Sequence, residues 1–245
     1  MSWMFPRRSG IRAPETREWI LGALYLPVYL YFLNLAILTY FPALGFPLTE
    51  PRNYFFANLL YMTVNFAVML LIFRRTLWQS LREFEGKMLL SVLIGFGMCY
   101  GANLVLTTAY TVLDIMPENY NQEAVNSLLG GYPLAMTLCT VVLAPLAEEC
   151  LFRGVLFAPL ARRCLPAAYA LSMFLFAGMH VFQFLGSMTA ANTILCLSLY
   201  LPASFSLCWV YQKTGNIWAC IFLHMFINFQ SVLASLLRSL MQAFL

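Results

Sequence analysis

The stretch Met88–Leu113 reads MLLSVLIGFGMCYGANLVLTTAYTVL and carries no charged residue between Lys87 and Asp114. The hydrocarbon core of a bilayer, about 30 Å thick, is crossed by roughly 20 apolar residues in an α-helix. Backbone polar groups find no water inside lipid, so a helix that pairs them internally is the expected conformation. This segment is therefore predicted to be a membrane-spanning helix.

Comparable apolar runs, bounded by charge, proline or glycine, recur along the whole chain. Six of them join the first: Trp19–Leu44, Tyr54–Phe73, Tyr132–Leu160, Ala167–Phe184, Thr193–Tyr211 and Ile217–Leu237. The predicted fold class is all-α, a polytopic transmembrane helix bundle of about seven spans, with eight as the alternative count. We expect a single transmembrane domain over residues 1–245, because no soluble second domain interrupts the runs.

The composition excludes a water-soluble fold. The chain of 245 residues is 62% hydrophobic and 10% charged, and its mean hydropathy is +0.76. Soluble domains carry about 25% charged residues. The polar residues are too few to cover so many apolar ones in water, so the lipid bilayer is the expected partner. A cell membrane, crossed several times, is the expected location.

Positive residues predict the orientation, since loops rich in Lys and Arg stay on the cytoplasmic side. With the N-terminus inside, all but Arg52 and Arg238 of the 14 Lys and Arg residues fall on one side. We therefore predict a cytoplasmic N-terminus. The spread of these charges over short loops fits contact with anionic lipid headgroups and gives no indication of nucleic acid binding. The predicted cytoplasmic set comprises Arg7, Arg8, Arg12, Arg17, Arg74, Arg75, Arg82, Lys87, Arg153, Arg162, Arg163 and Lys213.

Ionisable residues inside the predicted spans are few, and such residues point to function because they are costly in lipid. The sequence APLAEECLFRG, residues 144–154, places Glu148 and Glu149 in one span, with Arg153 just beyond them. Residues four apart share a helix face, so Glu149 and Arg153 can pair. Pairing lowers the cost of burying both charges. Glu148 points about 100° away and is left free to accept a proton.

The only two histidines of the chain, His180 and His224, also fall in predicted spans. Asn228 follows His224 by one helical turn, so both side chains can address one substrate atom. Phe176 precedes His180 by one turn and could wall a pocket or fix the imidazole. Each feature alone has a structural explanation, as an ion pair, a helix–helix contact or a packing residue. Their concentration in three late spans favours one shared polar site.

Three ordered motifs on separate helices resemble the CPBP family, the CAAX prenyl endopeptidases and bacteriocin-processing (Abi-type) intramembrane proteases. The resemblance covers about Pro133–Asn228, the expected catalytic core, and includes the K-T-G-N-I-W turn at Lys213–Trp218. The first 130 residues are similar to the family only in being hydrophobic. The motifs are Glu148-Glu149-x-x-x-Arg153, Phe176-x-x-x-His180 and His224-x-x-x-Asn228.

The resemblance implies hydrolysis of a peptide bond by a water molecule that a glutamate activates. Glu148 would be the general base, and His180 would help to hold the water. His224 and Asn228 would stabilise the oxyanion that forms when water attacks the scissile carbonyl. Donors aimed at such an oxyanion typically contribute about 3–4 kcal/mol each, and desolvation strengthens a carboxylate as a base.

The resemblance also implies a supporting role for two residues and raises the question of a bound metal. Glu149 and Arg153 would support the site by orienting their helix. The family is often described as metalloproteases, and Glu148, His180 and His224 could form a two-histidine, one-carboxylate set for a divalent metal such as zinc. The chain has no H-E-x-x-H sequence. A glutamate base works with the same residues unaided, so the favoured interpretation has no tightly bound metal.

Three functions compete at this point. The first is an intramembrane endopeptidase that cuts a peptide or membrane-protein substrate near the cytoplasmic side. The alternative is a non-catalytic bacteriocin-immunity or membrane scaffold protein of the same family. A proton-coupled transporter is disfavoured because no inverted-repeat pattern appears. Hydrolysis requires a wet cavity, and small or polar residues are expected to line it, such as Ser172, Gly178, Asn192 and Ser204.

Overall fold

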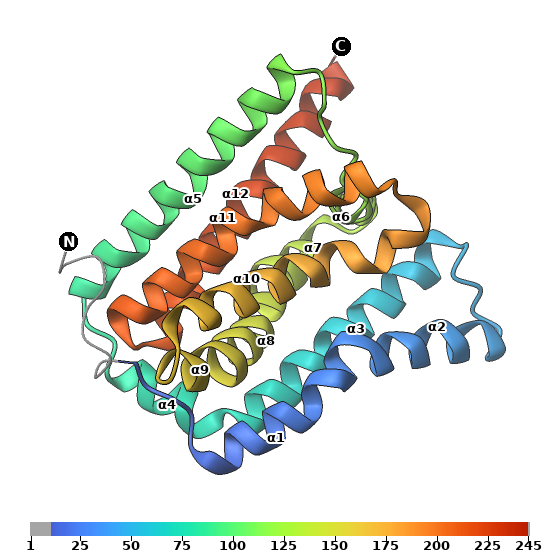
Figure 1. Cartoon of the computed structure of the whole chain (residues 1–245). Coiled ribbons are helices and arrows are strands. Elements are labelled where there is room, and N and C mark those ends of the chain that lie inside the picture. Colours follow the sequence, from blue (N-terminus) through green and yellow to red (C-terminus); the bar gives the residue numbers. More distant parts are fainter. Residues whose placement is uncertain (1–10, 245) are drawn as a thin grey trace.

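The computed structural model describes residues 11–244, and every regular element in this range is a helix (Figure 1). Arg7 and Arg8, which contribute to the predicted orientation, lie outside the described residues. The predicted all-α bundle with seven spans is confirmed, and the protein is a multi-pass membrane protein. Within residues 11–244, seven helices are long and apolar enough to cross a membrane: Thr16–Ala43, Pro51–Ile72, Lys87–Val112, Pro133–Ala161, Leu165–Ser187, Ala190–Thr214 and Ile217–Gln242.

Three of these spans are built from consecutive helical segments, and four are single helices. The first joins α1 (Thr16–Pro27), the π-helical η2 (Val28–Phe32) and α2 (Leu33–Ala43). The fourth joins α7 (Pro133–Leu138), η3 (Cys139–Leu143), α8 (Ala144–Glu149), η4 (Cys150–Phe157) and α9 (Ala158–Ala161). The fifth joins α10 (Leu165–Val181) to the 3-10 helix η5 (Phe182–Ser187). The single helices are α3 (Pro51–Ile72), α5 (Lys87–Val112), α11 (Ala190–Thr214) and α12 (Ile217–Phe244).

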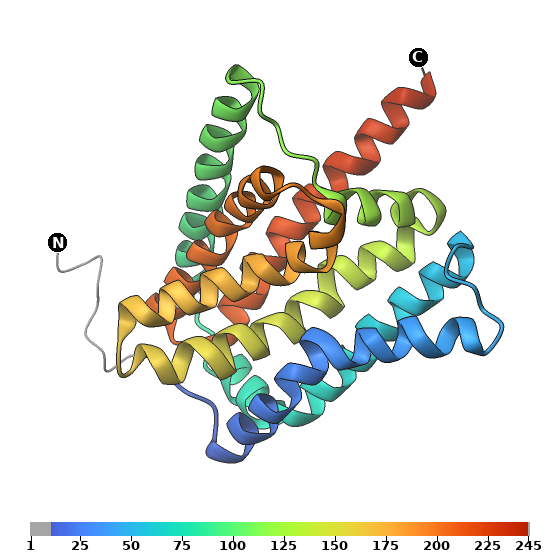
Figure 2. The ribbon, with the colours of Figure 1, turned by 45° about the vertical axis from the view of Figure 1, so that its right-hand side comes forward.

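The spans run alternately between two ends of the bundle (Figures 1 and 2). One end holds the start of α1, the short helix α4 (Arg74–Arg82) and the turn between α11 and α12. The opposite end holds the α2–α3 connection, the short helix α6 (Tyr120–Gly131) and the end of α12. The first end carries most of the lysines and arginines, so it is the end that we predict to be cytoplasmic.

A buried carboxylate ties the helix α4 to the first span. Glu18 accepts hydrogen bonds from the backbone N–H groups of Arg75 at 2.9 Å and Thr76 at 3.3 Å, and from the Thr76 hydroxyl. A carboxylate at this position satisfies free N–H groups of the first turn and complements the helix dipole. Because the first span begins at Thr16, ahead of the predicted Trp19, the buried acid Glu18 lies in its first turn, outside the predicted apolar run.

The fourth span, Pro133–Ala161, is the most buried one. Half of its most apolar window (50%) is buried, against 17% for the spans Thr16–Ala43 and Lys87–Val112. Helices α3 and α12 pack against α8, while α1 and α10 pack against η4. The π-helical segments η3 and η4 flank α8, and such turns are frequent at functional sites. A helix covered in this way can hold charges away from lipid.

The assignment of Arg153 to the cytoplasmic charges is wrong. Its side chain has 0% exposure and lies inside the fourth span, whose last residue is Ala161. Arg153 is buried because its guanidinium contacts the carboxylate of Glu149 and the carbonyl and hydroxyl oxygens of Ser204 within the bundle. The remaining loop charges still support the predicted orientation.

Candidate active site

The buried ion pair of Glu149 and Arg153 forms the base of the site. Nη1 of Arg153 donates to Oε1 of Glu149 at 3.2 Å, and Nε lies 3.2 Å from Oε2. Nη2 of Arg153 donates to the carbonyl oxygen of Ser204 on α11 at 3.1 Å. The guanidinium also lies 4.9 Å from the centre of the Phe176 ring, a cation–π contact. The predicted pairing is therefore observed, and it joins three helices.

Glu149 holds a histidine as well as the arginine. Its Oε1 atom lies 2.8 Å from Nδ1 of His224, which is 75 residues away in the chain. A carboxylate accepts and does not donate, so Nδ1 carries the hydrogen and Nε2 is left for the opposite side. A carboxylate behind an imidazole fixes both its tautomer and its orientation. The spacing of four residues predicted Arg153 as the partner of Glu149, and no signal in the sequence indicates the second partner, His224.

Glu148 faces the other nitrogen of the same imidazole. Its Oε2 atom lies 3.8 Å from Nε2 of His224, which is too long for a hydrogen bond. Oε2 is buried and has no hydrogen-bond partner among the described residues. A polar separation of this length can accommodate a bridging water or another oxygen. A buried carboxylate oxygen without a partner is unusual in folded proteins and calls for a functional explanation.

His180 approaches the same cluster from α10. Its Nδ1 atom lies 2.8 Å from the carbonyl oxygen of Phe176, so Nδ1 is the donor and Nε2 is an acceptor. The Phe176 ring contacts both imidazoles, with centroid distances of 4.9 Å to His180 and 5.5 Å to His224. The structure thus brings both histidines against one phenylalanine, the residue expected to wall the pocket.

Tyr200 on α11 is a site residue that the sequence analysis did not single out. Its ring stacks on His180, with centroids 4.5 Å apart and an interplanar angle of 21°. Its hydroxyl donates to Oδ1 of Asn119 at 3.0 Å and accepts from Nδ2 of Asn121 at 3.2 Å. A tyrosine in an apolar run is ordinary, so no local signal marks it. Only the contact between α10 and α11 reveals its place.

Asn228 has a partner that limits its predicted role. Its Nδ2 atom donates to the carbonyl oxygen of Thr140 in η3 at 2.8 Å. Asn228 and His224 were expected to address one substrate atom together, but one amide hydrogen is used in this helix–helix contact. A primary amide has a second N–H, which is left for a ligand. The contact anchors α12 to the fourth span one turn beyond His224.

The side chains considered as metal ligands do not form a metal site. Among residues 11–244, no group of three or more His, Cys, Asp or Glu side chains could hold a metal ion. Nδ1 of His224 is bound to Glu149 and Nδ1 of His180 to the Phe176 carbonyl, so only Nε2 of each ring could face a metal. Two histidines and a carboxylate must converge on one point to bind zinc. The residues present do not fit, and we assign no step to a metal.

The residues expected to line a wet cavity have other contacts. The Ser204 hydroxyl bonds the Ser172 carbonyl at 3.4 Å, and both side chains are buried. Asn192 exchanges two hydrogen bonds with the backbone of Glu118, of 2.9 Å and 3.0 Å. A Cβ atom at Gly178 would lie 2.4 Å from the Phe182 ring. Ser204, Asn192 and Gly178 therefore serve packing and loop contacts, while the buried Ser172 hydroxyl has no hydrogen-bond partner among the described residues.

Fold and site together define a polytopic α-helical membrane protein with an intramembrane Glu–Glu–Arg–His cluster. Residues 130–230 match the family described as type II CAAX prenyl endopeptidase Rce1-like. The matched residues contain all three motifs, and the match supports the resemblance to CPBP proteins.

One curated relative extends the similarity beyond this segment. The chain is 28% identical over 166 residues to "Putative membrane peptidase YdiL" of Bacillus subtilis (strain 168). The match covers 66% of this chain and 64% of that relative, so the chain spans somewhat less than two thirds of its length. No solved structure matches the chain.

Proposed function

We propose that the protein is an intramembrane endopeptidase that hydrolyses a peptide bond of a membrane-associated protein or peptide near the cytoplasmic side. The observation that carries the proposal is the unpartnered Oε2 of Glu148, which lies 3.8 Å from Nε2 of His224. The family match over residues 130–230 supports the reaction class. We assign the catalytic core to Pro133–Asn228, within a single transmembrane domain of residues 1–245.

In this mechanism Glu148 is the general base. Its carboxylate removes a proton from a water molecule, and the water oxygen attacks the scissile carbonyl carbon. Burial removes the hydration that would stabilise the charged carboxylate, which makes it a stronger base. His180 holds the attacking water through Nε2, since its Nδ1 hydrogen is bound to the Phe176 carbonyl.

The developing oxyanion receives donors from α12. As an imidazolium, His224 donates from Nε2 while Nδ1 stays bound to Glu149. The second N–H of Asn228 is the other donor, and the Thr140 contact holds that amide in place. When the tetrahedral intermediate collapses, the C–N bond breaks and Glu148 returns its proton to the leaving amine. Preorganised donors of this kind account for much of the rate enhancement in acyl transfer.

Glu149 and Arg153 do not touch the reacting atoms in this scheme. Arg153 neutralises Glu149 and ties it to Ser204 on α11, and Glu149 then orients His224. A buried pair of this kind is retained where it fixes geometry, since it adds little to stability by itself.

The test is a cleavage assay in liposomes with a library of proteome-derived, internally quenched peptides. We expect Glu148→Gln and His224→Ala each to lower the rate at least about 100-fold. The matched control is Glu123→Gln, since Glu123 is an exposed acid on α6. A parallel arm with a chelator is expected to leave the rate unchanged.

Two outcomes oppose the proposal. Wild-type rates in both Glu148→Gln and His224→Ala would remove these residues from the mechanism. A wild-type protein that cleaves no peptide, but binds a partner equally well with either substitution, would favour the scaffold or immunity function.

A further inference from the structure

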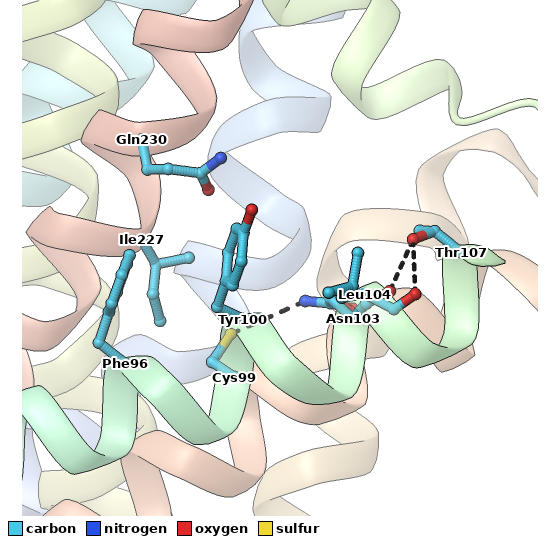
Figure 3. A pocket seen from close by; sticks show the side chains of 8 residues that line it. All are labelled: Phe96, Cys99, Tyr100, Asn103, Leu104, Thr107, Ile227 and Gln230. Atoms are coloured by element: carbon cyan, nitrogen blue, oxygen red, sulfur yellow. Dashed lines mark hydrogen bonds between the residues drawn. The ribbon is translucent and has the colours of Figure 1, made fainter.

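A hollow lies in the membrane-spanning part of the protein, between α5 and α12. This α5–α12 groove has a volume of about 240 Å³ (Figure 3). Its polar lining comprises Cys99, Tyr100, Asn103 and Thr107 of α5 and Gln230 of α12, and the apolar walls are Phe96, Leu104 and Ile227. None of these residues belongs to the three motifs, so the groove is separate from the catalytic cluster.

The groove presents hydrogen-bonding groups where lipid offers no partner. Oδ1 of Asn103 is buried and accepts no hydrogen bond from any described residue. Its Nδ2 atom makes only a 3.7 Å contact with the Cys99 sulfur. The Gln230 amide and the Tyr100 hydroxyl make no hydrogen bond within residues 11–244. Leu104, beside Asn103, is 56% exposed, which indicates that this side of α5 faces acyl chains.

The energetics decide what kind of occupant fits. An amide left unpaired in an apolar medium is costly, because it has lost its bonds to water and gained none in exchange. An acyl chain has no donor for Oδ1 of Asn103, so lipid alone leaves this cost in place. The volume of 240 Å³ is below the roughly 300–1,000 Å³ of small-molecule sites. A side chain of a docked transmembrane helix is small enough for this volume and can supply the hydrogen bond, since polar residues join helices in membranes.

The position of the groove relates it to the proposed reaction. Ile227 and Gln230 stand on α12 three and six residues after His224, so the groove lies within two helical turns of that histidine. A helix seated in the α5–α12 groove would therefore run along a neighbouring face of the helix that carries two catalytic side chains. A docked segment would thus keep the substrate beside the helix that carries His224 and Asn228.

We propose that the α5–α12 groove binds a membrane-spanning helix of the substrate, through a polar side chain that hydrogen-bonds with Asn103 and Gln230. The inference rests on the proposed function and names the substrate class, a protein with its own transmembrane span. It sets this class apart from soluble peptides and from peptides held in the membrane only by a lipid.

The test measures helix binding by fluorescence transfer in liposomes and needs no cleavage. The probes are two labelled Leu/Ala helices of about 22 residues, identical except for one central Asn in the first. Glu148→Gln protein is used so that no probe is cut. We expect the Asn helix to bind at least about fivefold more tightly than the apolar helix, as interhelical hydrogen bonds in membranes allow.

Substitutions in the groove test whether it causes the tighter binding of the Asn helix. Asn103→Leu/Gln230→Leu is expected to reduce the affinity for the Asn helix to that for the apolar helix. The matched control is Thr108→Val, an exposed polar residue of α5 outside the groove, and it should keep the preference. Thermal unfolding of the double variant checks that loss of binding is not loss of fold.

Three results would overturn the inference. The first is equal binding of both probe helices, and the second is an unchanged preference in the double variant. The third is fluorescence transfer between two labelled copies of this protein that is lost in the double variant. This result would show that the groove binds a second copy of the chain. Because the readout is binding, failure of the hydrolysis mechanism would show only in the cleavage assay.

Discussion

Oε1 of Glu149 bonds Nδ1 of His224 at 2.8 Å, and the same oxygen accepts a hydrogen bond from Nη1 of Arg153 at 3.2 Å. One carboxylate thus connects the fourth span with α12 and, through Arg153, with α11. The imidazole of His224 is thereby turned so that its second nitrogen faces Glu148. The orientation of this ring depends on a side chain that need not touch the substrate.

The buried ion pair should behave as a unit in stability measurements. Removing one partner leaves an unpaired buried charge, so Arg153→Leu is expected to destabilise the protein by about 3–5 kcal/mol. Glu149→Leu/Arg153→Leu should lose clearly less than Arg153→Leu, because no unpaired charge remains. Reversible unfolding in mixed micelles measures both. A double variant at least as unstable as the single one would contradict this account.

Substitution of Glu148 should abolish activity without loss of stability, unlike substitution of Arg153. Its Oε2 atom is buried without a hydrogen bond, so a neutral amide should be tolerated at least as well. Glu148→Gln is therefore expected to unfold at an equal or higher temperature while peptide hydrolysis falls at least about 100-fold. Differential scanning fluorimetry and the liposome assay on one preparation check it. A marked drop in unfolding temperature would show that the carboxylate is structural.

Tyr200 is expected to position His180 through its ring more than through its hydroxyl. The ring stack lies at 4.5 Å, while the hydroxyl bonds reach Asn119 and Asn121 near the start of α6. Tyr200→Leu should lower kcat by up to about 10-fold, since such a ring pair contributes about 0.5–1.5 kcal/mol. Tyr200→Phe keeps the stack and should retain most of kcat. Equal losses of kcat in both variants would assign the effect to the hydroxyl.

Gly95 should be sensitive to any added side chain because α5 approaches α11 and α12 closely there. A Cβ atom at Gly95 would lie 2.7 Å from a methyl group of Val210 and 2.9 Å from one of Leu223. Gly95→Val is expected to destabilise the protein by about 1–3 kcal/mol through overpacking. The matched control is Gly97→Val on the same helix, where a Cβ atom meets nothing within 4 Å. The unfolding midpoint of Gly95→Val should be lower than that of Gly97→Val, which should remain close to that of the wild type.

The sequence alone was sufficient for the all-α fold, the seven spans and the Glu149–Arg153 pair. A span needs only enough consecutive apolar residues to cross the hydrocarbon, and an i,i+4 pair needs only helix geometry. Both are local properties. The three motifs also pointed to a common site, because ionisable residues in lipid are too costly to be scattered without use.

Only the tertiary structure decided which partners those residues have. The Glu149–His224 bond joins residues 75 positions apart, and Asn228 bonds the Thr140 carbonyl 88 positions away. The burial of Arg153, the Tyr200 stack and the α5–α12 groove likewise arise where separate helices pack. The direction in which a helix turns its side chains depends on its neighbours' shapes, and the order of residues along one helix does not contain that information.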